Sequence, residues 1–513
     1  MKTRFLGRLA ALTAVAMLAG APMAATAFAQ EAAPAAAAPA AETTAAPAPA
    51  EAAPAAPAPA AEAAPAPEPN KGDTTWMSIS TVLVMLMIIP GLALFYGGLV
   101  RQKNMLSMLM QVSTVTVVGM ITWVLWGYSL AFTDGGAANK FVGGLSKLGL
   151  SGISVTSVVE TFSVGVVIPE LSFVAFQMTF ACITAALVLG GLAERLKFSA
   201  TVLFAIIWPI LVYYPMAHMV WWWAGATSGA GVDAAETIKG AGLLWGWGAI
   251  DFAGGTVVHI NAGIAALVGA VILGKRTGFQ KEPMPPHSLT LTMVGAGLLW
   301  VGWFGFNAGS NLESNGYAAL AIVNTFIATA AAGFSWVVVE WVTRKKASML
   351  GMASGIVAGL VAVTPAAGFA GPLGSLILGL IVSPICVIFC SAVKNALKYD
   401  DSLDAFGIHA VGGIVGAIGT GLLVNPAWGG QGIVDYSTCG ADGAAITVCS
   451  SAYDLGFQVL AQTKAVLFTI ALSGVGSAIV FFLIKFTVGL RVSPETEEEG
   501  LDISEHGERA YHS

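Results

Sequence analysis

Apolar segments long enough to cross a lipid bilayer recur along most of this chain. A helix needs about 20 apolar residues to span the hydrocarbon core of a membrane. Charged residues make up only 10% of the 513 residues, and the mean hydropathy is +0.78, whereas soluble domains carry about 25% charged residues. The sequence therefore predicts an all-α polytopic membrane protein. We expect eleven transmembrane helices, roughly at 76–99, 107–132, 169–193, 198–223, 251–274, 289–309, 316–343, 348–364, 371–397, 404–424 and 456–488.

Basic residues are unevenly distributed among the loops that join these segments. They follow the odd-numbered segments, as Arg101, Arg195 and Arg276 do, whereas the loops at 133–168 and 224–250 are rich in small residues and nearly free of arginine. Cytoplasmic loops of membrane proteins carry the excess of Lys and Arg. We therefore expect the odd-numbered segments to end in the cytoplasm, with the N-terminus of the mature chain outside and the C-terminus inside.

Two segments precede the predicted membrane domain. Residues 1–29 combine a basic start, an apolar stretch at 9–18 and small residues at Ala27 and Ala29, a pattern typical of a secretory signal peptide. A first transmembrane helix is the alternative, although the apolar stretch is shorter than a bilayer requires. Residues 30–72 are almost entirely Ala, Pro and Glu, which predicts an extended, disordered spacer.

Two of the apolar segments contain ionisable side chains. The fifth segment carries Asp251 and His259, and the tenth carries Asp404 and His409. Ionisable groups at membrane depth are costly, and they commonly mark a substrate pathway or a proton relay. One such histidine alone is equally well explained as a polar residue that joins two helices. Two histidines at matching places favour a pair that lines a pore.

The recurrence of this Asp/His pattern also indicates an internal repeat. Eleven segments allow two inverted halves of five helices, followed by one final helix. Transporters with inverted repeats commonly place their substrate site near the middle of the membrane, at the interface between the repeats. We therefore expect His259 and His409 to meet in the interior of the helix bundle.

Short polar and aromatic motifs occur within or beside these segments. They are Tyr96-Gly-Gly-Leu-Val-Arg101, Ala193-Glu-Arg195, Ala217-His-Met-Val-Trp221, Asp251-Phe-Ala-Gly-Gly-Thr-Val-Val-His259-Ile-Asn261, Gly302-Trp-Phe-Gly-Phe-Asn-Ala-Gly-Ser310 and Phe406-Gly-Ile-His409. Together they resemble the motifs of the ammonium transporter family (Amt, Mep and Rh proteins), in particular its bacterial Amt-type members, over essentially all of residues 72–513. The resemblance implies a homotrimer in the bacterial inner membrane. Each subunit would conduct ammonium nitrogen inward through one narrow hydrophobic pore, without a cofactor or a metal ion.

The resemblance also implies roles for individual side chains. An aromatic face attracts a small cation by about 0.5–2 kcal/mol, which suits transient capture. Which of the three consecutive tryptophans at 221–223 faces the outer vestibule stays open, and direct contact with the ion is the alternative to a structural role for Asp251. The implied roles are pore lining for His259 and His409, outer gating for Phe180 and Phe306, ammonium recruitment for Trp221, Ser310 and Phe176, and structural support for Asp251, Asp404 and Trp303.

The tail at 491–513 follows the predicted transmembrane domain at 73–490 and is rich in Glu and Asp. Acidic ends of this kind are usually no more than solvated termini. However, Glu499-Gly-Leu-Asp502, with His506-Gly-Glu508 after it, resembles the family's ordered cytoplasmic tail, at which a PII-type signal protein docks. We therefore expect a regulatory tail and a PII-type partner.

Two other classes of function compete with transport. An ammonium sensor would use the same pore and signal through its tail, but no output domain follows residue 488. A membrane enzyme with metal-bound histidines would need a ligand motif such as His-Glu-x-x-His, which the apolar segments lack. The net charge of -6 and the short basic runs give no indication of nucleic-acid binding.

The five cysteines are too few for a disulfide framework in a chain of this length. Cys182, Cys386 and Cys390 lie in apolar segments, where we expect free thiols. Cys439 and Cys449 lie in a loop predicted to be outside the cytoplasm, where disulfides form. We expect a disulfide bond between these two cysteines, although closing so short a loop would stabilise the fold by only about 3 kcal/mol at most.

Overall fold

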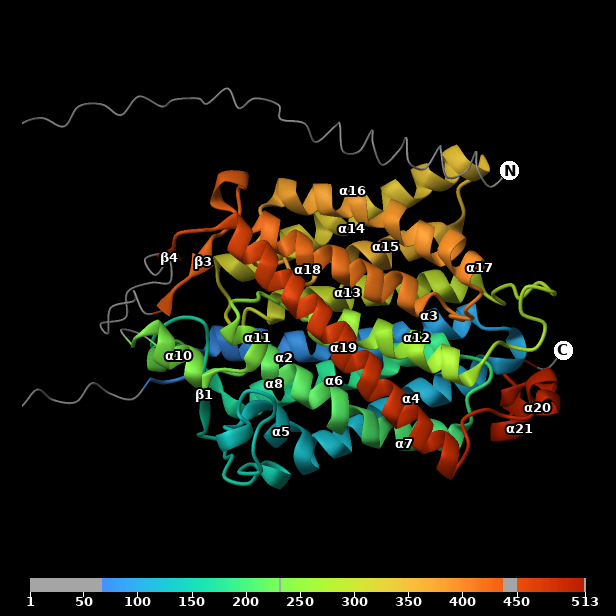
Figure 1. Cartoon of the computed structure of the whole chain (residues 1–513), viewed down its shortest axis with the longest axis horizontal. Helices are drawn as coiled ribbons and strands as arrows, with labels where there is room; N and C mark the ends of the chain where they lie inside the picture. The colour runs from blue at the N-terminus through green and yellow to red at the C-terminus, as the bar shows by residue number, and fades with distance from the viewer. Residues whose placement is uncertain (1–66, 230–231, 437–449, 512–513) are drawn as a thin grey trace, which may run out of the picture.

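The computed structural model describes residues 67–229, 232–436 and 450–511 as a mostly helical protein (Figure 1). Among these residues, ten helices are long and apolar enough to cross a membrane. A shorter apolar helix, Met349–Val363, lies where the eighth segment was predicted. With 15 residues, it is shorter than the roughly 20 residues that a bilayer requires.

The helices run alongside one another in a single bundle, and α19 crosses its surface obliquely (Figure 1). The α-helices are α2 Lys71–Leu86, α3 Ala93–Leu99, α4 Met105–Thr122, α5 Tyr128–Phe132, α6 Glu170–Leu192, α7 Phe198–Trp208, α8 Tyr214–Trp221, α9 Ala226–Gly229, α10 Ala234–Gly240, α11 Leu243–Gly246, α12 Asn261–Leu273, α13 Leu289–Gly309, α14 Gly316–Arg344, α15 Met349–Val363, α16 Pro372–Val387, α17 Lys394–Leu397, α18 Val411–Leu423, α19 Leu455–Thr487, α20 Pro494–Glu499 and α21 Leu501–His506.

Several spans contain a short π-helical segment, in which the α-helical hydrogen-bond register is interrupted. Such segments often occur at functional sites. The 3-10 helices are η2 Gln102–Asn104, η4 Gly136–Ala138, η5 Leu148–Leu150 and η10 Pro426–Trp428. The π-helical segments are η1 Met87–Leu92, η3 Trp123–Gly127, η6 Pro209–Tyr213, η7 Gly255–Ile260, η8 Ile388–Val393 and η9 Phe406–Ala410.

Two small antiparallel sheets lie in the connecting loops, and the prediction of an all-α protein did not include them. Strands β1 (Val158–Glu160) and β2 (Val167–Pro169) form one pair, and β3 (Ile433–Val434) and β4 (Ser450–Ser451) form the other. Strands of two or three residues are too short to leave an alternating pattern in the sequence. These sheets and α10 lie at one end of the bundle, whereas α20 and α21 lie at the other (Figure 1).

The helix boundaries agree with most of the predicted segments to within a few residues. One difference is at the start, where α2 begins at Lys71 and Asn70 caps it by accepting a hydrogen bond from the amide of Gly72 (2.6 Å). Lys71 and Gly72 are therefore helical, rather than part of the predicted spacer. The predicted signal peptide, the spacer up to residue 66, and the predicted bond between Cys439 and Cys449 lie outside the described residues.

Glycines allow the two histidine-bearing spans to approach each other closely. A Cβ atom at Gly263 of α12 would lie 2.3 Å from the backbone nitrogen of Ala410, and one at Gly413 of α18 would lie 3.0 Å from the carbonyl oxygen of Gly255. The first distance is shorter than real Cβ contacts, and the second is tighter than most of them, so a larger residue would force the neighbouring backbone to shift. Backbone-to-backbone packing at small residues is how helices associate in lipid, and here it brings η7 and η9 together.

A cluster of buried charges joins the loops at the end of the bundle where the tail lies. Arg276 forms ion pairs with Glu194 (3.0 Å) and Asp400 (2.9 Å), and Arg101 forms a second pair with Glu194 (2.8 Å). Burial opposes the ionisation of Glu194, but the neighbouring Arg276 and Arg101 outweigh it and hold the pKa of this carboxyl below its usual range. The cluster therefore ties the ends of four spans together.

The C-terminal tail is folded onto the same end of the bundle. The Asp502 carboxylate accepts a hydrogen bond from the amide of Ser107 in the first turn of α4 (2.8 Å), and the Asn104 side chain accepts one from the amide of Leu501 (2.9 Å). Glu505 accepts a hydrogen bond from the amide of Phe198 at the start of α7 (2.9 Å). Acidic side chains of the tail thus bond with otherwise unpaired N–H groups at two helix N-termini.

The buried charge cluster generates a stability prediction for Arg276→Met. This change leaves the carboxylates of Asp400 and Glu194 without their shared partner, which typically costs about 3–5 kcal/mol. We expect the unfolding temperature of the detergent-purified protein, followed by intrinsic tryptophan fluorescence, to fall markedly. Lys275→Met is the matched control because Lys275 is adjacent and exposed. Equal unfolding temperatures for the two variants would show that the cluster does not stabilise the fold.

Candidate functional site

The helix that carries His259 begins inside the bundle, and Asp251 caps its first turn. Oδ1 of Asp251 accepts hydrogen bonds from the amides of Gly254 (2.9 Å) and Gly255 (2.6 Å). Oδ2 accepts from the amides of Thr256 (2.8 Å) and Val257 (3.2 Å). The first N–H groups of a helix have no partner within it, and leaving them unpaired in a buried place is costly. Asp251 satisfies them all.

A second aspartate, which the sequence analysis missed, does the same for the helix that carries His409. Asp401 is buried and accepts hydrogen bonds from the amides of Ala405 (3.0 Å), Phe406 (2.9 Å) and Gly407 (3.4 Å). A signal for it was present in the sequence. Asp251 and Asp401 each precede their histidine by eight residues.

Asp404, the residue selected from the sequence, does not cap this helix. Its carboxylate forms an ion pair with Lys394 (2.8 Å), and 36% of its side chain is exposed. It contributes its backbone carbonyl, which accepts a hydrogen bond from the amide of Ile408 (2.9 Å). The carboxylate that corresponds to Asp251 is therefore Asp401, because the fold of the loop before η9 directs the earlier aspartate towards the free amides.

His259 and His409 meet in the interior of the protein, in the place expected from the sequence. Their Nδ1 atoms are 3.4 Å apart, and the two rings are nearly parallel, with centroids 5.4 Å apart and planes 20° apart. Both side chains are buried, with 1% and 4% exposure. Among the ion pairs of the described residues, none includes either histidine.

The contact between the two Nδ1 atoms constrains the protons of both rings. A neutral imidazole has one N–H donor and one acceptor nitrogen. One histidine must therefore donate through Nδ1 and keep an acceptor at Nε2, while the other accepts through Nδ1 and keeps a donor at Nε2. Nε2 of His259 is buried and has no hydrogen-bond partner among the described residues. It is available to a small polar molecule.

Aromatic rings enclose the histidine pair on the His259 side. The imidazole of His259 stacks on the indole of Trp303, with centroids 5.3 Å apart and planes 22° apart. Nε1 of Trp303 donates a hydrogen bond to the Thr364 hydroxyl (2.9 Å), which fixes the indole. Phe306 lies 6.0 Å from His259 by ring centroids. Trp303 thus supports one face of His259.

Phe306 also packs against Phe180, the other residue predicted to form the outer gate. The two rings stack with centroids 4.1 Å apart and planes only 12° apart. Phe176, one turn earlier on α6, packs against Phe180 at 4.9 Å. Since all three rings are buried, a molecule that passes here must displace a ring.

Trp221 is the one of the three consecutive tryptophans that reaches this stack. Its ring meets Phe180 edge to face at 5.9 Å, and its Nε1 donates a hydrogen bond to the carbonyl oxygen of Asp251 (2.9 Å). Trp222 instead stacks on His218, and Trp223 stacks on Trp245. The contacts therefore answer which tryptophan lies next to the predicted gate.

Ser310 lies one helical turn after Phe306, at the end of α13. Its hydroxyl donates a hydrogen bond to the carbonyl oxygen of Phe306 (2.8 Å), and 9% of the residue is exposed. The oxygen keeps lone pairs that can accept a hydrogen bond from another donor. The residues assigned to capture, gating and pore lining thus follow one another along a continuous line of contacts.

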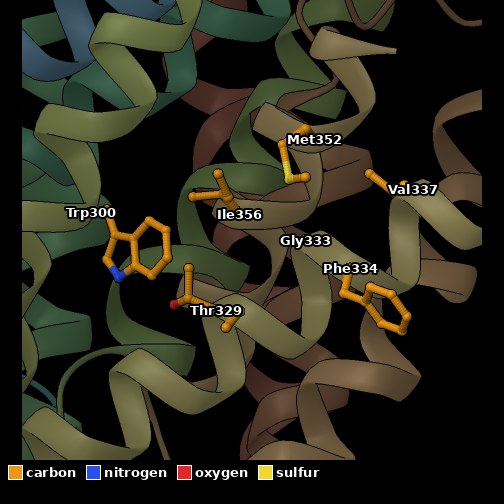
Figure 2. A pocket seen from close by; sticks show the side chains of 8 residues that line it. Trp300, Thr329, Gly333, Phe334, Val337, Met352 and Ile356 are labelled. Carbon is orange, nitrogen blue, oxygen red and sulfur yellow. The ribbon is translucent and has the colours of Figure 1, made fainter. Parts of the chain in front are cut away.

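A separate apolar groove of about 270 Å³ lies among α13, α14 and α15 (Figure 2). None of the predicted site residues lines it. The described residues also contain no group of three or more His, Cys, Asp or Glu side chains arranged to hold a metal ion. The groove is lined by Trp300, Thr329, Ala330, Gly333, Phe334, Val337, Met352 and Ile356.

Comparisons of the sequence and of the fold with known proteins give the same family. Residues 75–511 match the model of the Ammonium Transporter Family. An ammonium transporter of Aquifex aeolicus is 44% identical over 443 residues, which cover 86% of this chain and 93% of the relative. An ammonium transporter of Bacillus subtilis is 41% identical over 440 residues, which cover 86% and 98%.

Solved structures agree with these relatives. The crystal structure of Saccharomyces cerevisiae Mep2 matches with a TM-score of 0.69 at 31% identity, over 83% of this chain and 91% of that one. A protein described as a sensor Amt protein matches with a TM-score of 0.71 at 25% identity, over 85% and 98%.

The fold and the apolar helices define a multi-pass membrane protein, and its relatives are transporters. The chain belongs to the ammonium transporter family. This membership supports ammonium transport as its activity, and the family is one of transporters rather than enzymes.

The cap at Asp401 generates a prediction for the segment that holds His409. Asp401→Ala removes the acceptor for three buried amides, and an unsatisfied buried donor costs about 1–3 kcal/mol. We expect a lower unfolding temperature and faster amide hydrogen exchange at residues 405–409. Asp404→Ala is the control, since a partly exposed ion pair contributes about 1 kcal/mol or less. If Asp404→Ala were the more damaging change, the assignment of the cap would be wrong.

Proposed function

We propose that this protein takes up ammonium by capturing the cation outside, releasing its proton, and passing neutral ammonia through the pore to the paired histidines. The observation that carries the proposal is the contact between Nδ1 of His259 and Nδ1 of His409, buried among aromatic and small residues. One free Nε2 acceptor and one free Nε2 donor suit a molecule such as ammonia, which both donates and accepts hydrogen bonds.

The energetics of dehydration favour neutral ammonia over the ion inside the pore. Moving an unpaired cation out of water into an apolar interior costs many kcal/mol. The carboxylates of Asp251 and Asp401 are already engaged by backbone amides. Among the described residues, neither carboxylate pairs with His259 or His409, so no counter-charge is in direct contact with an ion beside the histidines.

Capture is proposed to occur at Trp221, Ser310 and Phe176, outside the gate formed by Phe180 and Phe306. The indole of Trp221 offers a cation–π face, and the hydroxyl of Ser310 offers an acceptor. Asp251 supports the capture site without contacting the ion. Its carboxylate caps η7, and its backbone oxygen accepts a hydrogen bond from Trp221. Trp303 supports His259 by stacking on its imidazole ring.

We infer that the fold is an inverted repeat of five plus five helices with a final eleventh helix. The short α15 would be the eighth span, continued by the turns after Val363. The matching caps at Asp251 and Asp401, each followed after eight residues by a histidine in a π-helical segment, support the repeat. The last helix, α19, then falls outside both halves.

The proposed setting is a homotrimer in the bacterial inner membrane, with the N-terminus outside and the C-terminus in the cytoplasm. The basic loop residues Arg101 and Arg276 lie at the same end of the bundle as the tail, which supports a common cytoplasmic face. The tail is proposed to be the docking site of a PII-type signal protein. Nothing observed in the described residues favours the sensor function over transport.

The histidine pair generates the central functional prediction. Replacing both His259 and His409 by Leu keeps apolar bulk but removes every hydrogen-bonding group at the pair, so we expect a folded trimer that loses ammonium-driven current. The current is measured on reconstituted protein after an ammonium pulse, and uptake of labelled methylammonium into a transport-deficient host provides a second readout. His287→Leu, in the loop before α13, is the control and should keep the current. Wild-type current in the double variant would remove the histidines from the mechanism.

The docked tail generates a second functional prediction. Deleting residues 492–513 removes the caps that Asp502 and Glu505 provide, but water can reach those amides at the membrane surface. We expect a folded protein with reduced uptake and no binding to a PII-type protein. Removing only residues 512–513 should change neither property. Co-purification of the truncated protein with the signal protein would contradict docking at the tail.

A further inference from the structure

His218 is a buried histidine that the proposed transport route does not use. It lies in the last turn of α8, three residues before Trp221, and its exposure is 0%. Its ring joins α8 to the end of α5 and to the loop that follows α5, through contacts with the backbone of Ala131 and Asn139.

Both ring nitrogens of His218 face hydrogen-bond acceptors. Nδ1 lies 3.0 Å from the carbonyl oxygen of Ala131, and Nε2 lies 2.7 Å from the carbonyl oxygen of Asn139. A carbonyl oxygen cannot donate, and a neutral imidazole has only one N–H group. In the neutral form, one of these contacts would place two lone pairs against each other. Only the imidazolium satisfies both.

Some groups around His218 favour its positively charged form, and others disfavour it. Burial of a cation is costly. Burial is the largest influence on the charge of this ring and disfavours the imidazolium, whereas the carbonyl oxygens of Asn139 and Ala131 and the carboxylate of Asp134 favour it. The indole of Trp222 stacks on the ring with centroids 5.7 Å apart, which suits a cation. Lys140 lies in the same loop, but its ammonium donates to the carbonyl of Ala241 (3.1 Å). The segments α5, α8 and α11 contribute no charged side chain other than His218 itself.

The position of His218 connects this charge to the proposed capture site. The carbonyl oxygen of His218 accepts a hydrogen bond from the amide of Trp222 (3.0 Å). This bond closes the helical turn that contains Trp221. Trp221 in turn packs on Phe180 and bonds with the backbone of Asp251. A shift of the end of α8 would therefore move the indole that lies next to the gate.

We propose that His218 is a positioning residue for ammonium capture, which as an imidazolium donates to the carbonyls of Ala131 and Asn139 and so holds Trp221 beside the gate. This inference rests on the proposed function of Trp221. Loss of the proton removes one of the two hydrogen bonds and replaces it with a repulsive contact. Capture of ammonium therefore weakens as the outer pH rises through the titration of His218.

The protonation state is tested without any transport assay. Protein labelled with ¹⁵N-histidine is reconstituted in lipid bilayers, and solid-state NMR distinguishes ring nitrogens that carry a proton from those that do not. The signals of His218 are those that disappear in His218→Gln. We expect both nitrogens of His218 to carry a proton at pH 6, and one unprotonated nitrogen there would overturn the proposal.

The effect on capture is tested with two substitutions that differ in charge. His218→Gln is neutral, whereas His218→Lys supplies an ammonium that only donates and whose ordinary pKa, about 10.4, lies far above that of an imidazole. We expect His218→Gln to raise the KM for ammonium by about two- to tenfold at pH 6, the equivalent of one hydrogen bond, with little change in maximal rate. His218→Lys should keep a low KM that no longer depends on pH between 6 and 8.

The two readouts separate this inference from the proposed function. Two protonated nitrogens together with an unchanged KM in His218→Gln would refute the positioning role, whatever the route of ammonia. A KM that keeps its pH dependence in His218→Lys would also refute it. Loss of current in the variant without His259 and His409 leaves these outcomes unaffected, because neither residue contacts His218.

Discussion

The meeting of two imidazoles in this bundle depends on two helices whose first turns are buried. A helix that starts in an apolar interior exposes backbone N–H groups that neither lipid nor side chains of ordinary apolar type can satisfy. Asp251 and Asp401 supply carboxylates at these two places. Glycines at 263 and 413 then let the two backbones approach until the rings are in contact. The caps are therefore a condition for the site, although neither carboxylate lies in it.

Much of the architecture is encoded locally, and for that reason it could be predicted. Segment length and hydropathy predicted the ten long helices to within a few residues at most ends, and the rarity of ionisable groups in apolar segments pointed to His259 and His409. The cap at Asp401 was missed because the choice between it and Asp404 depends on how the loop folds. The small sheets were beyond reach because strands of two or three residues leave no alternating pattern in the sequence, whereas α15 lies within one residue of the predicted eighth segment at each end.

The aromatic residues show a second limit of the sequence. Three tryptophans in succession look equivalent in the chain, and only the packing separates them: Trp221 contacts Phe180, Trp222 stacks on His218, and Trp223 stacks on Trp245. Buried phenylalanines are common in membrane helices, so Phe180 and Phe306 are distinguished by their mutual stack rather than by their type. The rings that fill the core at this place are the same ones that are proposed to gate the pore.

The tail has a consequence for any protein that binds to it. While docked, the tail places the carboxylates of Asp502 and Glu505 on the first turns of α4 and α7. If the tail is lifted, two helix ends with partial positive charge become bare at the membrane surface. A partner that displaces the tail must therefore cover those ends with acceptors of its own, or leave them to anions from the surrounding solution. Exchange of one set of anions for another is sensitive to salt, so the balance between the docked and released tail depends on the ionic strength on that side of the membrane.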